Sequence, residues 1–145
     1  AQVTGWVNLS GSWFYLAPET GAMATGWQMV ADKWFFFAAN GAMKTGWFYT
    51  SGAWYYLDPS GSMHTGWLTM GSHWYLMGDS GAMTIGWKPM GGTWYYFDAS
   101  GRMVTGWQQI GGVWYYFGTG GDMYTGGHWI GWRWYTFSSG GQWLG

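Results

Sequence analysis

Aromatic and polar positions follow one another along this chain in a unit of about twenty residues that recurs seven times. Each unit opens on a Gly-Trp pair or its equivalent and continues, seven residues after the first Trp position, with a second aromatic run such as Trp54-Tyr55-Tyr56. In 46–57 the two aromatic runs flank Ser51-Gly52, which suits a tight turn with positive φ. The pattern therefore predicts a β-hairpin in every unit, near residues 5–16, 26–37, 46–57, 66–77, 86–97, 106–117 and 126–137.

A recurrence of this period is typical of a stacked repeat protein, because one hairpin is only marginally stable in water. We therefore expect an all-β fold in which residues 1–145 form a single repeat domain. The turn slot holds glycine in most units, whereas Ala31-Asp32 and Gly131-Trp132 fit it less well.

Strand alternation sorts the rings of each hairpin onto two faces. Along Trp94-Tyr95-Tyr96-Phe97, Trp94 and Tyr96 point to one side, and Tyr95 and Phe97 point to the other. We expect the Tyr95 and Phe97 face to form the core. The two Trp of each unit and the aromatic two places after the second Trp are then expected to line grooves between hairpins.

Composition limits what such grooves can bind. With 16 Trp, 11 Tyr and 8 Phe, the chain has more aromatic surface than a core of this length uses, so many rings are expected to be exposed. Five Lys plus Arg against six Asp plus Glu leave a net charge of −1, which argues against nucleic acid as a partner. No apolar run reaches the roughly eighteen residues that a bilayer span needs, so we expect no membrane insertion.

The sequence gives no sign of catalysis. The six acidic residues are scattered, and several occupy loop positions where Asp is an ordinary turn residue. His64, His73 and His128 show no metal-ligand spacing, and Cys is absent. We therefore expect no catalytic residue, no metal and no cofactor. Catalysis, if the parent protein has any, would lie in a segment outside this chain.

An open aromatic groove with few charges suits either a quaternary ammonium, held by cation–π attraction, or the apolar face of a sugar. The stretch Gly106-Trp107-Gln108-Gln109-Ile110-Gly111-Gly112-Val113-Trp114-Tyr115-Tyr116-Phe117 resembles the choline-binding repeats of surface proteins and autolysins of Gram-positive bacteria and their phages. This resemblance implies a left-handed β-solenoid of about seven stacked hairpins that binds choline of teichoic or lipoteichoic acid. It also implies a secreted protein attached non-covalently to the cell wall.

The resemblance further implies aromatic cages between consecutive hairpins, each with two Trp of one hairpin and a ring of the next. Carried over to this chain, the four complete cages are Trp6/Trp13/Phe36, Trp27/Trp34/Tyr56, Trp67/Trp74/Tyr96 and Trp87/Trp94/Tyr116, with Met23, Met43, Met83 and Met103 as fourth walls. Two further sets depart from the pattern and are expected to be weaker or altered, namely Trp47/Trp54/Leu76 and Trp107/Trp114/Thr136. Gly127 replaces the Trp of a cage that would need an eighth hairpin.

Two alternatives stay open at the level of sequence. Glucan-binding repeats of glucosyltransferases and clostridial toxins have similar length and aromatic content, although the second-strand Trp is retained here in all seven units. Exposed apolar ends of a solenoid also favour pairing, so a homodimer through a terminal hairpin is a further option.

Overall fold

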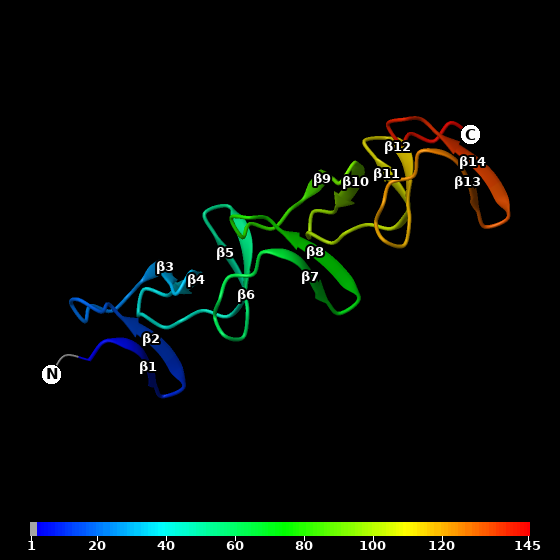
Figure 1. Ribbon diagram of the computed structural model, residues 1–145. Helices are drawn as coiled ribbons and strands as arrows, with labels where there is room; N and C mark the ends of the chain where they lie inside the picture. Colours follow the sequence, from blue (N-terminus) through cyan, green and yellow to red (C-terminus); the bar gives the residue numbers. More distant parts are fainter. Residues whose placement is uncertain (1–2) are drawn as a thin grey trace. The chain divides into compact units, whose positions relative to one another are not determined.

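The computed structural model describes residues 3–145, and its strands pair in chain order as seven two-stranded hairpins (Figure 1). The strands are β1 (Gly5–Leu9), β2 (Ser12–Leu16), β3 (Gly26–Val30), β4 (Lys33–Phe37), β5 (Gly46–Thr50), β6 (Ala53–Leu57), β7 (Gly66–Met70), β8 (His73–Met77), β9 (Gly86–Met90), β10 (Thr93–Phe97), β11 (Gly106–Ile110), β12 (Val113–Phe117), β13 (Gly126–Ile130) and β14 (Arg133–Phe137). The predicted all-β architecture of stacked hairpins is confirmed. Residues 3–145 contain no helix with the length and apolarity needed to cross a membrane.

The two-residue turn within each hairpin is of type I′ or II′, the types whose backbone twist matches that of the strands. Ala31 and Asp32 both have positive φ, 52° and 67°, as in a type I′ turn, although neither residue is glycine. Among residues 3–145 this is the only turn with two non-glycine residues in that strained region, so the predicted poor fit is confirmed there. At Gly131-Trp132 the poor fit is not found, because only Gly131 has positive φ, 64°, and a type II′ turn needs glycine only there.

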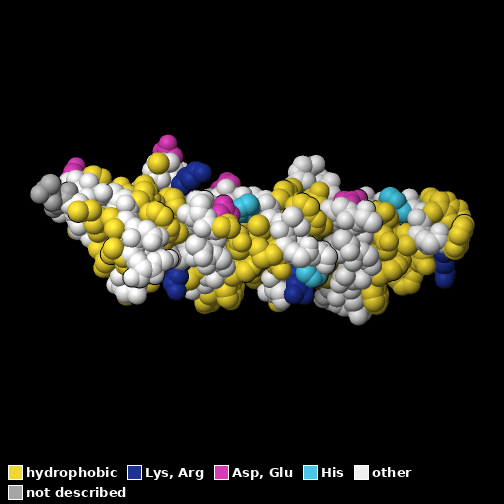
Figure 2. Space-filling model, turned by 90° about the horizontal axis from the view of Figure 1, so that it is seen from below, with side chains coloured by type: hydrophobic (Ala, Val, Ile, Leu, Met, Phe, Trp, Pro, Cys, Tyr) yellow, Lys and Arg dark blue, Asp and Glu magenta, His cyan; other side chains and the backbone are white. Residues whose placement is uncertain are grey.

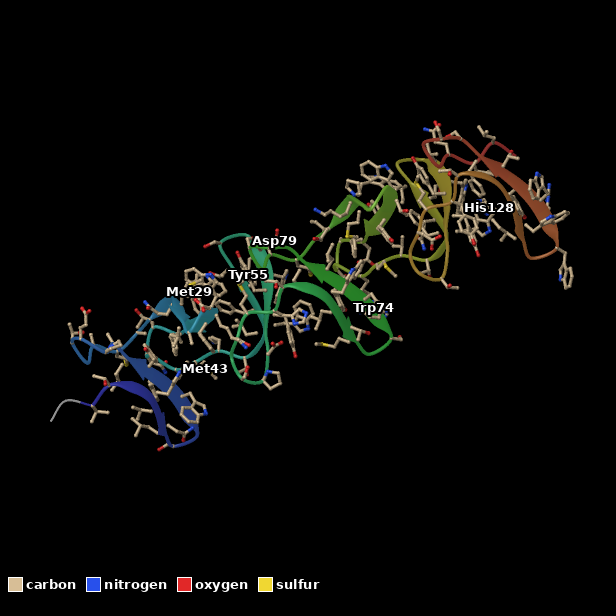
Figure 3. All side chains as sticks on the ribbon, in the orientation of Figure 1. Met29, Met43, Tyr55, Trp74, Asp79 and His128 are labelled. Atoms are coloured by element: carbon tan, nitrogen blue, oxygen red, sulfur yellow. The ribbon has the colours of Figure 1, made fainter. Side chains whose placement is uncertain are left out.

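Backbone hydrogen bonds tie each of the first six hairpins to the loop that follows the next hairpin. Met43 lies in the loop after β4 (Figure 3) and donates its backbone N–H to the carbonyl of Trp13 on β2, at 2.8 Å. Near the C-terminal end, Met123 donates in the same way to Trp94, at 3.0 Å. Because a loop thus reaches back past its own hairpin, a repeat is held in place only when its neighbours are folded.

The core is formed mainly by the last residue of the second strand in hairpins two to seven, whereas Leu16 at the end of β2 is only partly buried. Phe37, Leu57, Phe97 and Phe117 are fully buried, each with 0% exposure. This confirms the core position predicted for Phe97. Tyr95 on the same face is only partly buried, which leaves its ring within reach of a groove.

The chain divides into two compact units, and each is described by itself. One comprises Ala1–Gly66 with Met77–Met83, and the other comprises Trp67–Leu76 with Thr84–Gly145. The single domain over residues 1–145 that the repeat pattern predicts stays a prediction.

Candidate functional site

The two Trp of a hairpin meet at nearly a right angle. Trp6 and Trp13 have ring centroids 6.4 Å apart and an interplanar angle of 83°. Trp27 and Trp34 are 6.5 Å apart at 86°. The same geometry recurs in Trp67/Trp74, Trp87/Trp94 and Trp107/Trp114, with distances of 6.1, 6.2 and 6.4 Å.

The hairpin register explains why these two side chains meet. Trp6 pairs with Tyr15 across the first hairpin, and Trp13 lies two residues before Tyr15 on the same strand. Cross-strand partners and residues two apart share a face, so Trp6, Trp13 and Tyr15 lie on one side of the hairpin. Trp6 is 38% and Trp13 44% exposed, so both rings of this pair remain open to solvent.

A third ring comes from the opposite face of the next hairpin. Phe35 lies 5.0 Å from Trp6, and Tyr55 lies 5.0 Å from Trp27. The equivalent contacts are Trp67 with Tyr95 at 6.0 Å, Trp87 with Tyr115 at 4.9 Å and Trp107 with Tyr135 at 5.0 Å. Stacking therefore brings the Trp face of one hairpin against the core face of its successor.

This geometry corrects the third ring that the sequence suggested. Phe36 contacts Trp27 of its own hairpin at 5.1 Å instead of completing the Trp6/Trp13 pair. The other three predicted third rings behave alike, with Tyr56 beside Trp47 at 5.2 Å, Tyr96 beside Trp87 at 5.0 Å and Tyr116 beside Trp107 at 5.1 Å. The alternation of side chains along the strand could have identified the correct third ring. The residue directly after the second Trp is the one that faces the preceding hairpin.

The fourth walls are also displaced, by one repeat. Met43, from the loop after the next hairpin, lines the cavity of Trp6, Trp13 and Phe35, where Met23 was expected. Met103 lines the cavity of Trp67 and Trp74, where Met83 was expected. Met63 lines a cavity together with Trp34, where Met43 was expected. Met123 donates its backbone N–H to the Trp94 carbonyl, as Met43 does to Trp13, so we expect it at the fifth set in place of Met103. Met83 donates its N–H to the Trp54 carbonyl, and Met23 is 46% exposed.

The two sets expected to be weaker have different outcomes. Trp47 and Trp54 lie in one compact unit and Leu76 in the other, so the weakened third set stays a prediction. In the sixth set, Thr136 pairs with Gly127 in its own hairpin and leaves Trp107 facing Tyr135.

The sixth set in fact has a fourth ring. Trp143, which takes the place of the loop methionine, lies 6.0 Å from Trp107 at an angle of 74°. Trp107, Trp114, Tyr135, Trp143 and Arg133 together line a cavity of about 420 Å³. The sixth set is thus altered, as one of the two expected outcomes had it, although through Trp143 and not through Thr136. Whether it binds more weakly stays a prediction.

The cavities at Trp6/Trp13 and Trp67/Trp74 are small, partly open and largely apolar in their walls, whereas the cavity at Trp34 is more polar and is lined by Asp32, Lys33, Asp58, His64 and Asp79. The Trp6/Trp13 cavity measures about 380 Å³ and is completed by Pro59 and Ser60. The Trp67/Trp74 cavity measures about 300 Å³ and is completed by Thr119 and Gly120. Every residue that lines these two cavities is uncharged. Figure 2 shows the same balance on one face, where hydrophobic side chains predominate and charged ones are scattered.

The acidic residues mainly organise loops. Asp98 Oδ1 accepts hydrogen bonds from the backbone N–H groups of Ser100 and Arg102, at 2.9 and 3.0 Å. Such bonds are typical of Asp in turns. In residues 3–145 no three His, Asp or Glu side chains gather as they would around a metal ion.

Two family models match the chain. A model described as a choline-binding repeat matches residues 24–66 and 84–128. A model of a cell wall binding repeat matches residues 4–23 and 65–83. No curated protein sequence matches significantly.

Several solved structures are similar to the chain. Choline binding protein F from Streptococcus pneumoniae, crystallised in the presence of a peptidoglycan analogue, is 38% identical, with a TM-score of 0.94 over 98% of this chain and 52% of its own. CbpJ from Streptococcus pneumoniae TIGR4 is 43% identical, with a TM-score of 0.92 over 98% of this chain and 48% of its own. The pneumococcal cell wall endolysin from phage Cp-1, complexed with choline, is 33% identical, with a TM-score of 0.58 over 86% of this chain and 38% of its own. The chain thus spans about half the length of the first two.

Proposed function

We propose that this chain, which belongs to the choline-binding repeat family, is a non-catalytic module that binds choline in the aromatic cages between its hairpins. The observation that carries the proposal is the recurring set of two perpendicular Trp rings closed by a third ring from the next hairpin, as in Trp6, Trp13 and Phe35. A trimethylammonium group donates no hydrogen bond, so ring faces and shape are what can recognise it. The choline complex of the phage Cp-1 endolysin supports the same ligand class.

The cage geometry favours a compact cation over a sugar. Walls at 83° to 87°, as in Trp6/Trp13 and Trp67/Trp74, enclose a rounded group on several sides. A sugar ring, by contrast, needs polar side chains for its hydroxyl groups, and the Trp67/Trp74 cavity offers only the hydroxyl of Thr119 and the indole N–H groups beside its apolar walls. Glucan binding is therefore kept as an outcome of the test.

A single cage is expected to bind weakly. Each cation–π contact contributes about 0.5–2 kcal/mol, and binding costs reduce the sum. A dissociation constant on the order of millimolar, equivalent to about −4 kcal/mol, is therefore expected for one cage. Firm attachment then requires several cages on one polymer that bears many choline groups, since later binding events occur at a high effective concentration.

Teichoic and lipoteichoic acids decorated with phosphocholine are polymers of this kind. We infer that the module attaches a secreted protein non-covalently to the bacterial cell wall. Any enzymatic activity of the parent protein would then lie outside this module.

The proposal is tested by retention on a quaternary-amine resin. The chain should be retained and then released by free choline, but not by sodium chloride of equal ionic strength. Trp94→Ala removes one cage wall and should reduce the number of choline molecules bound in calorimetric titration. Trp132→Ala is the matched control, because Trp132 is 100% exposed and lines none of the described cavities.

Avidity supplies a second readout. The triple variant Trp13→Ala/Trp74→Ala/Trp94→Ala removes one wall from each of three cages. Its affinity for choline-bearing cell walls should fall by a much larger factor than the number of intact cages does. Release by salt alone, or binding of a soluble glucan without any binding of choline, would contradict the proposal.

A further inference from the structure

The sixth ring set differs in charge from the other described cavities, because Arg133 is its one charged lining residue. The cavity at Trp34 is also charged, but there Lys33 is accompanied by Asp32, Asp58 and Asp79. Trp107, Trp114, Tyr135 and Trp143 give it four aromatic walls, and Arg133 adds a guanidinium to the lining. The Trp6/Trp13 and Trp67/Trp74 cavities have no charged lining residue. One array therefore contains aromatic cages of different electrostatic character.

Strand register places Arg133 directly at the cage. Arg133 is the first residue of β14, pairs with Ile130 and lies two residues before Tyr135, so both side chains share a face. Its guanidinium carbon lies 5.6 Å from the centre of the Tyr135 ring. That ring is also the one that closes the cage against Trp107, at 5.0 Å.

This arrangement changes which ligand the cage favours. Free choline would bring a second positive charge close to the guanidinium, and like charges at short range disfavour each other. When a ligand has an anionic group beside its trimethylammonium, that anionic group and the guanidinium attract each other. Arg is especially suited to phosphate, because its planar fork of N–H donors matches two phosphate oxygens.

We propose that the sixth ring set binds phosphocholine in preference to free choline, with the aromatic walls holding the trimethylammonium group and Arg133 binding the phosphate. The inference rests on the proposed function, since it assumes that the cages bind choline. It assigns Arg133 as a specificity-determining residue and makes the C-terminal cage the one that senses the phosphate of the cell-wall polymer.

The expected preference is modest because Arg133 is exposed. Surface ion pairs are weakened by solvent and salt, so a preference of about two- to fivefold is expected at low ionic strength. The preference should decline as salt is added. Cages with uncharged linings should show no comparable preference.

Another cage in the same chain provides a gain-of-function test. Val113 is the first residue of β12, pairs with Ile110 and lies two residues before Tyr115, as Arg133 does before Tyr135. Tyr115 closes the cage of Trp87 at 4.9 Å. Val113→Arg should therefore transfer the phosphocholine preference to the fifth cage.

The experiment is an NMR titration of the full chain with 15N-labelled Trp indoles, in which choline chloride and phosphocholine are compared at equal ionic strength. The Trp143 indole signal, assigned by Trp143→Phe, reports the sixth cage, and the Trp94 signal, assigned by Trp94→Phe, reports the fifth. In the unmodified chain the ratio of choline Kd to phosphocholine Kd should be about two to five at Trp143 and about one at Trp94. Arg133→Gln should bring the Trp143 ratio to about one, and Val113→Arg should raise the Trp94 ratio.

Each outcome decides one of the two proposals. Equal ratios at Trp143 in the unmodified chain and in Arg133→Gln, with clear binding of choline at Trp94, would overturn the role of Arg133 and leave the proposed function intact. Absence of binding of either ligand at both signals would overturn both. The indole spectra of the variants show at the same time whether each chain is folded.

Discussion

Replacing Phe35 with leucine should weaken choline binding at the first cage, whereas the same change at Phe36 should not. Phe35 lines that cavity and lies 5.0 Å from Trp6. Phe36 lies on the opposite face of the same strand, 5.1 Å from Trp27 and 4.4 Å from Phe48. Both changes remove one ring and keep an apolar side chain, so they form a matched pair on opposite faces of one strand, with Phe35 buried and Phe36 partly buried.

The magnitude follows from the contacts that are lost. Removal of one cation–π contact costs about 0.5–2 kcal/mol, which corresponds to a roughly 2- to 30-fold rise in the dissociation constant. Phe35 is 8% exposed, so its replacement also costs packing energy. A swap between apolar side chains in a core typically costs less than about 1.5 kcal/mol, which the folded array should tolerate.

The assay is a choline titration followed at the Trp13 indole signal, with circular dichroism as the check on folding. Phe35→Leu should shift the Trp13 midpoint upward, and Phe36→Leu should leave it where it is. If Phe36→Leu weakens binding at Trp13 as much as Phe35→Leu does, the assignment of faces to cages is wrong.

Three further predictions concern stability. Choline at about 100 mM should raise the thermal midpoint, because a ligand that binds only the folded array stabilises it, by about 2.7 kcal/mol per cage at a hundred times a millimolar Kd; no rise in a calorimetric scan would argue against binding. Gly121→Ala should destabilise more than Gly106→Ala, by roughly 1–3 kcal/mol in urea unfolding, because both glycines have positive φ but only at Gly121 would a Cβ collide with the Met103 side chain. Equal losses would show that Met103 gives way freely. Replacing Ala31-Asp32 with Asn-Gly should raise the melting temperature by a few degrees, about 1 kcal/mol, because Asn and Gly tolerate the positive φ of a type I′ turn; an unchanged midpoint would mean that this turn carries no strain.

Local periodicity was enough to place the hairpins. The two-residue alternation, the Gly-Trp pairs and the turn glycines are properties of neighbouring residues, so the positions of all seven hairpins could be predicted from them. The same alternation correctly placed Phe97 in the core, and it placed Tyr95, two residues earlier, on the same face. The expectation of exposed paired Trp rings also followed from it.

The composition of each cage depended on contacts between repeats. Sequence alone does not show which face of one hairpin meets which face of the next, so Phe36 was chosen where stacking brings Phe35 to Trp6. Nor does it show that a loop reaches back past its own hairpin, which moved the methionine wall from Met23 to Met43. The joining of Trp143 to the sixth cage has the same origin. These pairings join residues far apart in the chain, and only the packing of one repeat on another determines them.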